Sequence, residues 1–275
     1  MARGKVMRGK GRSIIVSGRR GFTPLEIKVF NGAGKRFLTG FTLVELLVVI
    51  SIIAILMAIL MPILRNAKER TRETICKANL RSVGIGLLMY SDDNDNTMAD
   101  SSITNGFLWY DSPGVFKKID DSDAYWGVAY IDYVKETKVF GCPSLRRVPE
   151  LIYSVDPKLI QEAAFGLNMN VSSKNTDAMR HHSQFIVTHD HVEPKMEQGS
   201  RDMFHNDGPG TVNLTHYREG GHRARFYRDI FRHNIRISER FRTGGRANIL
   251  WLDGHVSSLE ETTGNNVPER WYTGD

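Results

Sequence analysis

The chain has 275 residues, of which 41% are apolar, 25% charged and 9% aromatic, a composition that excludes disordered and collagen-like proteins. Its net charge of +6 is unevenly spread, because residues 1–40 carry ten Lys or Arg side chains and a single acid, Glu26. That segment has a net charge of +9, so residues 41–275 sum to −3. The basic balance therefore gives no argument that the folded body binds nucleic acid.

The longest apolar run follows the basic segment directly. Residues 46–61 carry no charge, and residues 41–64 contain only Glu45. A helix needs about 20 such residues to cross the hydrocarbon core, and no second run approaches that length, which excludes a multi-pass transporter or channel. A secretory signal peptide has an apolar region of about 7 to 15 residues and a small-residue cleavage site, which this run lacks. We therefore expect a single membrane-anchored helix.

The flanking charges predict the orientation of this helix. The basic excess is +9 before the run and +4 between Arg65 and Arg81. The more basic flank stays in the cytoplasm. We therefore expect a single-pass protein of the inner membrane with a cytoplasmic N-terminus and an exported body.

Glu45 does not fit a simple anchor, because it lies inside the apolar run. An ionised carboxylate costs about 2.5 to 3.5 kcal/mol near the bilayer centre on insertion scales. A cut between Gly40 and Phe41 would create an α-amino group close enough to pair with Glu45 of the same or a neighbouring subunit. Alternatively, Glu45 lies in the headgroup zone of a signal anchor and pairs with nothing. The charge pattern alone leaves both interpretations open.

The sequence Gly40-Phe41-Thr42-Leu43-Val44-Glu45, followed by an apolar helix that contains Pro62, resembles the N-terminal signature of type IV pilins and type II secretion pseudopilins. The resemblance implies that a prepilin peptidase removes residues 1–40 after Gly40 and that the Phe41 amine is methylated. It also implies assembly through a helix in which Glu45 pairs with the Phe41 amine of an adjacent subunit.

The leader departs from this resemblance in two ways. It is long for such proteins, which leaves Met7 or a later residue open as the true start. It also contains a second copy of the motif, Gly21-Phe22-Thr23-Pro24-Leu25-Glu26. Because the residues after this copy cannot span a bilayer, we interpret it as a decoy.

Residues 65–90 keep a helical period, so one face can pack on a globular domain. Pro62 removes a backbone donor and is a candidate for a kink. Gly84 and Gly86 either weaken the last turn or allow a close approach of the body. Turn formers at 91–96 are expected to end the helix. The predicted stripe consists of Ile75, Asn79, Val83 and Leu87, with Cys76, Leu80, Gly84 and Leu88 beside it.

Residues 91–275 are expected to form the exported head. Apolar segments between turn signals predict short strands there, and two of them flank Asp253-Gly254. This is a strong hairpin signal, because a tight two-residue turn needs positive φ at both central residues. The predicted strands are 115–119, 138–140, 185–188, 248–252 and 255–259.

The predicted fold class is α+β and pilin-like. A long N-terminal helix spans the membrane with its first half, 41–64, and continues as an amphipathic helix over 65–90. The second half packs on a C-terminal mixed α/β head, 91–275, that contains antiparallel strands.

The C-terminal hairpin supports a narrower resemblance. Residues 246–256 are similar to the terminal motif of a pilin-like family, abundant in planctomycete-type bacteria, that is named for a His, nine residues, then Asp-Gly. Here Thr243 stands at the position of the His, and His233 is the nearest candidate. An insertion around 235–244 would explain this, and it puts a role for the His in doubt. Further similarities lie at 76–80, 90–94, 142–144 and 166–170.

Cys76 and Cys142 both fall on the exported side. In an oxidising compartment they could form a disulfide that closes a loop of about 65 residues and stabilises the fold by roughly 4 kcal/mol. Two buried thiols are the alternative.

The polar motifs assign no metal site. His189-Asp190-His191 on a strand would place both rings on one face, but no third ligand stands at a recognisable spacing. Asp92, Asn94 and Asn96 resemble the start of a calcium loop that lacks its Gly and its Glu, so an ordinary helix-ending turn is favoured. Calcium remains a candidate to test, and no cofactor is predicted.

The remaining motifs do not indicate catalysis. Residues 218–246 contain nine Arg with interleaved aromatics, as in some single-stranded nucleic-acid binders, but a subunit contact surface accounts for them equally well. We therefore do not predict nucleic acid as a partner. No nucleophile elbow, P-loop or dinucleotide fingerprint is present, so no enzymatic activity is predicted.

These observations predict a structural, pseudopilin-like subunit. Its partners would be a prepilin peptidase, the lipid bilayer, copies of itself and other pilin-like subunits, in a periplasmic or surface filament such as that of a type II secretion system. The alternative is a membrane-anchored, pilin-derived module whose head binds a glycan, DNA or a secreted protein. A third hypothesis, an unprocessed signal-anchored protein, predicts that residues 1–40 are retained.

Overall fold

The structure is a computed structural model. It describes residues 7–9, 12–14, 41–145, 162–196, 203–205, 227, 229–237 and 242–274. The chain divides into two compact units, Met1–Arg65 and Asn66–Asp275, and each is described by itself.

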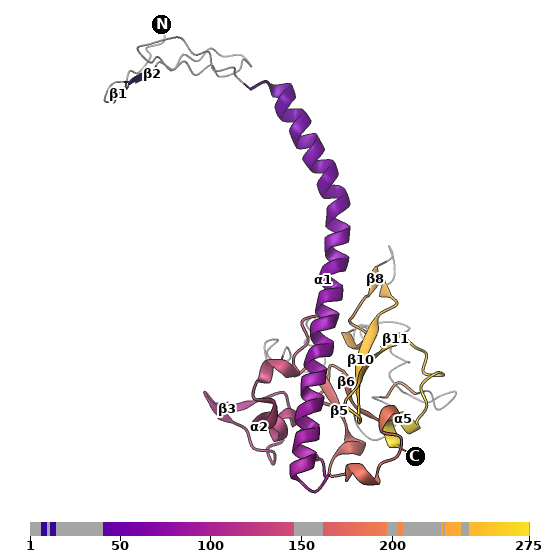
Figure 1. Cartoon of the computed structure of the whole chain (residues 1–275). Coiled ribbons are helices and arrows are strands. Elements are labelled where there is room, and N and C mark those ends of the chain that lie inside the picture. The colour runs from indigo at the N-terminus through magenta and orange to yellow at the C-terminus, as the bar shows by residue number, and fades with distance from the viewer. Residues whose placement is uncertain are drawn as a thin grey trace. The chain divides into compact units, whose positions relative to one another are not determined.

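The first unit contains a short hairpin and the start of the long helix. Strands β1 (Met7–Gly9) and β2 (Arg12–Ile14) pair antiparallel. Helix α1 (Leu43–Asp93), purple in Figure 1, runs through Pro62 without a break. Among the described residues it is the one helix whose length and composition would allow it to cross a membrane.

The second unit contains the rest of α1, which packs against the head. Cys76, Leu80 and Val83 are fully buried there, whereas Ile75 and Leu88 of the predicted stripe are exposed. The stripe is therefore confirmed only in part. The helix ends at Asp93, within the predicted run of turn formers.

The head is built around one five-stranded sheet of order β11-β10-β6-β5-β7, seen behind α1 in Figure 1. Four neighbouring strands, from β11 to β5, pair antiparallel, and β7 joins β5 in parallel. Strands β5 and β6 are buried along their whole length. The strands are β5 (Phe165–Asn168), β6 (Ile186–Asp190), β7 (Lys195–Met196), β10 (Arg246–Trp251) and β11 (Val256–Glu260).

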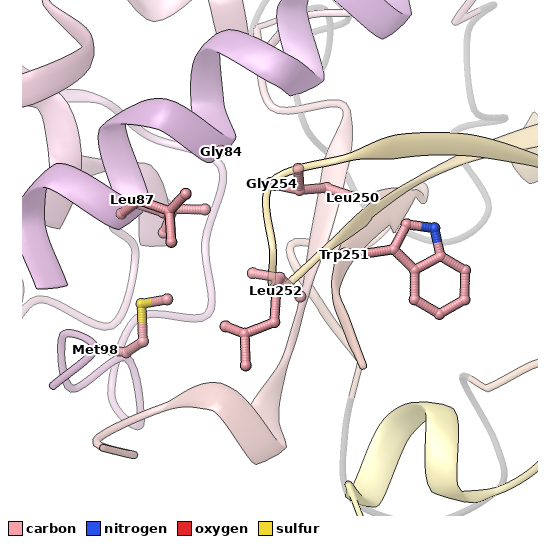
Figure 2. Close-up of a pocket in the computed structure, with 9 residues that line it drawn as sticks. Gly84, Leu87, Met98, Leu250, Trp251, Leu252 and Gly254 are labelled. Carbon is pink, nitrogen blue, oxygen red and sulfur yellow. The ribbon is translucent and has the colours of Figure 1, made fainter. Parts of the chain in front are cut away.

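Two glycines let α1 approach the head closely. A Cβ on Gly84 would lie 2.7 Å from Leu250 Cδ1 of β10, and a Cβ on Gly86 would collide with Val134. The close approach, one of the two readings of these glycines, is therefore confirmed. Figure 2 shows the small apolar pocket between this part of α1 and the β10–β11 hairpin.

Short elements complete the head beside the sheet. They include the hairpin strands β3 (Tyr110–Ser112) and β4 (Val115–Phe116), the 3₁₀ helices η1 (Trp126–Tyr130), η2 (Thr137–Phe140), η3 (Met169–Val171), η4 (Thr176–Ala178) and η5 (His182–Gln184), the one-turn helices α2 (Ile131–Val134) and α5 (Arg270–Thr273), and the paired strands β8 (Arg236–Ile237) and β9 (Arg242–Thr243).

The structure confirms some of the predicted strands and contradicts others. The segments at 185–188, 248–252 and 255–259 are confirmed except for one terminal residue each, since residues 186–188, 248–251 and 256–259 lie in β6, β10 and β11. Only the first two residues of 115–119 form a strand, β4. The strand predicted at 138–140 is wrong: this segment is the 3₁₀ helix η2, in which Phe140 packs on Trp109 and Trp126.

The β10–β11 turn also differs from its prediction. Only Gly254 has positive φ, and Asp253 does not. The Gly254 N–H donates to Trp251 O, and the Trp251 N–H donates to His255 O, so three residues form the turn instead of two. A turn of this length needs the left-handed conformation at one position only.

The α+β, pilin-like fold class is confirmed. A long apolar helix leads into a head with a mixed sheet and antiparallel strands.

Candidate functional site

The start of α1 is held by a reciprocal pair of side chains. The Thr42 N–H and Oγ1 donate to Glu45 Oε2 at 2.8 and 2.7 Å, and the Glu45 N–H donates to Thr42 Oγ1 at 3.2 Å. This is a capping box, which satisfies backbone donors that a helix start leaves open. It also places a carboxylate at the positive end of the helix dipole. Glu45 therefore has a partner within its own chain.

The predicted processing point lies next to this cap. Gly40 falls outside the described residues, and Phe41, 64% exposed, directly precedes Thr42. Every large apolar side chain from Leu43 to Leu64 is exposed in the single chain. The apolar helix therefore offers its whole circumference to lipid or to other helices.

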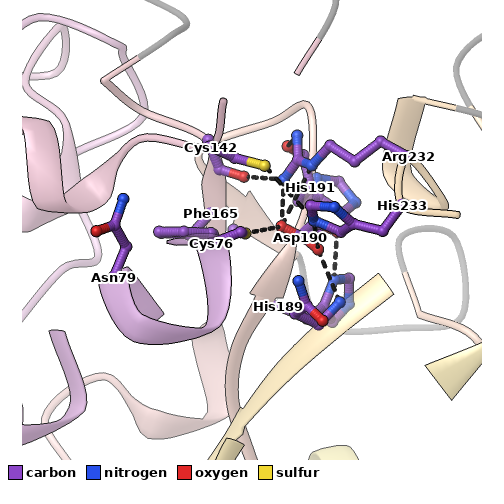
Figure 3. Close-up of polar contacts among 12 residues, drawn as sticks. Cys76, Asn79, Cys142, Phe165, His189, Asp190, His191, Arg232 and His233 are labelled. Atoms are coloured by element: carbon purple, nitrogen blue, oxygen red, sulfur yellow. Dashed lines mark hydrogen bonds and ion pairs between the residues drawn. The ribbon is translucent and has the colours of Figure 1, made fainter. Parts of the chain in front are cut away.

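A second group of polar residues is buried in the head around Asp190, the last residue of β6 (Figure 3). Its Oδ1 accepts from Arg232 Nη2 at 2.7 Å and from the Cys76 thiol at 3.3 Å. Its Oδ2 accepts from the Asn248 N–H at 2.7 Å and lies 3.1 Å from His233 Nε2. Both carboxylate oxygens thus have partners inside the protein.

The two cysteines belong to this cluster. Both are buried free cysteines, and the Cys142 Sγ lies 3.5 Å from His233 Nε2. The ligand atoms of Cys76, Cys142, Asp190 and His233 all lie within 4.8 Å of one another. The two cysteines do not form a disulfide in this structure, and their pairing remains a prediction.

The electrostatics of the cluster favour the ionised forms of Asp190, His233 and Cys142, whereas burial raises the pKa of the Cys76 thiol and favours its neutral form. Burial opposes the charge of Asp190, but Arg232 and His233 outweigh it and hold the carboxyl pKa well below its usual range. Burial also opposes the charge of His233, but Asp190 raises its pKa to about 9. For Cys142, the hydrogen bond from Cys76 and the charge of Arg232 overcome burial and lower the thiol pKa to about 5.

The histidines flanking Asp190 lie close together but have separate partners. The rings of His189 and His191 are 5.4 Å apart and buried. His189 Nε2 lies 3.2 Å from the Tyr272 hydroxyl, and His191 Nδ1 accepts from the Glu193 N–H. The prediction that a strand places both rings on one face is consistent with this distance, although β6 ends at Asp190, one residue before His191. The residue between them, Asp190, is the one that reaches the cysteines.

Sequence reasoning missed this cluster because its members are far apart in the chain. Cys76 and Asp190 are 114 residues apart, and Cys142 and His233 are 91 apart. No ligand spacing of a known metal motif applies to such distances. The usable signal was the alternation along β6, which points Asp190 away from the flanking histidines.

His233 lies just before residues 235–244, the segment suspected of being an insertion. Its N–H donates to Arg246 O, and the Arg246 N–H donates to His233 O. Strands β8 and β9 lie between these two residues and pair with each other. An insertion at 235–244 would produce this arrangement, since it keeps His233 beside β10.

The calcium candidate is a helix-ending turn in the structure. Asn94 Nδ2 donates to Tyr90 O, and Asn96 Nδ2 donates to Asp177 Oδ2 at 2.7 Å. Asp95 and Asn96 both have positive φ, as the turn requires. These amides support the chain reversal. Within the described part of the chain, the potential ligands that converge are the four of the Asp190 cluster.

Much of the Arg-rich stretch 218–246 lies outside the described residues. Two of its arginines have clear partners: Arg232 is buried with Asp190, and Arg246 pairs with Glu260 at 2.8 Å.

Comparison with known proteins identifies a family motif near the start of α1. A family described as the prokaryotic N-terminal methylation motif matches residues 39–61. No curated protein and no solved structure matches the chain. The match begins just before the Thr42–Glu45 cap and covers the apolar half of α1. The chain thus carries the methylation motif of type IV pilin-like proteins, which prepilin peptidase processes, at the start of a helix suited to anchoring in a membrane.

Proposed function

We propose that this protein is a structural, pseudopilin-like subunit. Prepilin peptidase cleaves it after Gly40 and methylates Phe41, and the mature chain assembles through α1 into a periplasmic or surface filament, as in type II secretion. The observation that carries the proposal is the methylation motif at 39–61, placed at the start of an exposed apolar helix.

The geometry of Glu45 supports a role between subunits. Its described hydrogen bonds all go to Oε2, which leaves Oε1 available for a further donor. An ionised carboxylate in the membrane needs a compensating charge. The α-amino group of a processed Phe41 on a neighbouring chain supplies that charge, while Thr42 keeps the carboxylate in position.

The surface of α1 supports assembly as well. Its large apolar side chains between Leu43 and Leu64 are exposed in the part of the chain that the structure describes. Helices in lipid associate by packing and polar contacts, because lipid tails already satisfy apolar side chains. A bundle of such helices would bring the neighbouring Phe41 and Glu45 ends together.

The test separates the charge of Glu45 from its capping role. Glu45→Gln keeps an acceptor for the Thr42 N–H and removes the charge, since Gln also serves in capping boxes. Thr42→Val removes the side-chain half of the cap and keeps the carboxylate. Both variants would be expressed with prepilin peptidase and an assembly platform, and sheared filaments and subunit crosslinks would be measured.

We expect Glu45→Gln to abolish assembly while the chain is still processed and inserted. Thr42→Val should assemble at a level near that of the unmodified chain. If Glu45→Gln assembles and Thr42→Val does not, assembly depends on the helix cap and not on the charge of Glu45. Assembly of both variants would overturn the inter-subunit role and leave the head as the functional part.

A further inference from the structure

Four buried side chains of the head present metal-ligating atoms to one another. They come from four separate segments: α1, the loop after η2, the end of β6 and the residue that bridges to β10 (Figure 3). We propose that Cys76, Cys142, Asp190 and His233 bind one zinc ion as a structural site.

The distances suit a zinc ion. A tetrahedral site with metal–ligand distances of about 2.0 to 2.3 Å has ligand atoms about 3.3 to 3.8 Å apart. The Cys142 Sγ and His233 Nε2 are 3.5 Å apart, and Nε2 lies 3.1 Å from the nearer oxygen of Asp190. The Cys76 Sγ is 3.3 Å from the other oxygen. The separations among the four ligand atoms extend to 4.8 Å, so binding the ion would draw the most distant ligands together by about 1 Å.

The donor set identifies the class of metal. Thiolates and imidazole favour zinc, whereas calcium and magnesium require oxygen donors. Four protein ligands leave no open position, which is typical of a structural site rather than a catalytic one. All four residues are buried, so exchange with solvent is restricted.

The charges of the filled site balance. Two thiolates and the Asp190 carboxylate contribute three negative charges, and Zn²⁺ with the buried Arg232 guanidinium contributes three positive ones. A buried group of charges is tolerated when it is paired and hydrogen-bonded. Thiolates without the ion would leave the cluster with excess negative charge.

The surroundings hold the ligands in place. Arg232 donates to Asp190 Oδ1 through both Nε and Nη2, and the Asn248 N–H fixes Oδ2. The backbone of His233 is tied to Arg246 by two hydrogen bonds. Such outer contacts orient metal ligands and tune their affinity. The ion would join the anchor helix directly to the sheet.

Metal and thiol content of the unmodified protein provide the first test. The full chain would be extracted in detergent without chelator or reductant, and zinc would be measured by elemental mass spectrometry. Thiols would be titrated after denaturation in the presence of chelator. We expect about one zinc and two titratable thiols per chain. A chain without titratable thiols contains a disulfide and overturns the proposal, as does a chain with two thiols that takes up no zinc on dialysis against it.

Substitution of His233 provides a second test that a disulfide cannot mimic. His233→Gln removes one ligand and leaves both cysteines, so zinc should be lost while two thiols remain. The control, His255→Gln, changes an exposed histidine outside the cluster and should retain the metal. Equal zinc content in the two variants would overturn the proposal.

Cobalt replacement keeps the test independent of how well the variants fold. The unmodified chain, stripped of metal and loaded with Co²⁺, should show thiolate-to-cobalt charge transfer and the intense visible bands of tetrahedral coordination. A spectrum without thiolate bands would overturn the assignment.

Discussion

Arg232 and Asp190 form an ion pair in the interior of the head, with Nη2 and Oδ1 2.7 Å apart and the two side chains 2% and 0% exposed. Arg232 also donates to the carbonyl oxygens of Ala164 and His191. One guanidinium thus connects the end of β6 and the residue after it with the residue before β5. Removing it would leave the buried Asp190 carboxylate without its guanidinium partner and would take one donor from each of the two carbonyls.

Arg232→Ala should therefore lower the free energy of unfolding by about 3 to 5 kcal/mol, as expected when one partner of a buried pair is removed. The matched control is Arg246→Ala, whose exposed pair with Glu260 should contribute about 0 to 1 kcal/mol. Urea unfolding followed by tryptophan fluorescence would compare the two. Similar losses at both positions would contradict the assigned importance of the buried pair.

The contact between Gly84 and Leu250 predicts a steric effect. Gly84→Val would press the new side chain into β10, and overpacking of this kind costs about 1 to 3 kcal/mol. Ile85→Val introduces the same residue at the next position, which is 54% exposed, and should change stability by less than about 0.5 kcal/mol. Thermal unfolding measures both. A Gly84→Val chain as stable as the control would show that α1 can move away from the sheet.

Asn168 supports a prediction with a defined pH dependence. Its Nδ2 donates to Ile186 O and Tyr272 O, both at 2.8 Å, in a fully buried setting. Asn168→Asp places a carboxylate against these two carbonyls and should cost more than about 2 kcal/mol at neutral pH.

The protonated form of the new carboxyl can still donate to one carbonyl, so its pKa should be higher in the folded chain than in the unfolded chain. The penalty should then be smallest below the unfolded pKa and grow as the pH rises to the folded value. Unfolding at pH 5 and pH 8, each relative to the unmodified chain, measures this. Asn175→Asp, at an exposed cap position, is the control and should show little pH dependence.

The processing motif occurs twice, at 21–26 and at 40–45, and only the second copy precedes an apolar helix. Gly40→Val should block removal of the leader, because the residue at the cut no longer fits the peptidase, and full-length chain should accumulate. Gly21→Val should be processed normally and yield a chain that begins at methylated Phe41. Intact mass and N-terminal sequencing in the presence of a prepilin peptidase measure both. Loss of processing in Gly21→Val alone would assign the cut to the upstream copy.

Local signals made parts of this fold predictable. The uncharged run at 46–61 indicated the apolar half of α1, and Gly254 with its flanking alternation indicated the β10–β11 hairpin. The strand expected at 138–140 failed because contacts distant in sequence decided its conformation. Phe140 packs in an aromatic group with Trp109 and Trp126, and a 3₁₀ turn places it there.

The two candidate sites also differ in whether local sequence signals could predict them. The Thr42–Glu45 cap could be read from four consecutive residues, since its spacing is that of a capping box. The Asp190 cluster could not, because the cysteines suggested only a pairing with each other. Its assembly depends on the register of β6 beside β10 and on the return of the chain at His233.

The excursion from His233 to Arg246 begins and ends at one hydrogen-bonded pair. Because the two ends of this segment are held together by these hydrogen bonds, the number of residues between them does not affect the position of β10. This arm can therefore be lengthened, trimmed or replaced without moving β10. It offers a permissive position for an epitope or a fluorophore that reports on the head while leaving α1 and the interior of the head unaltered.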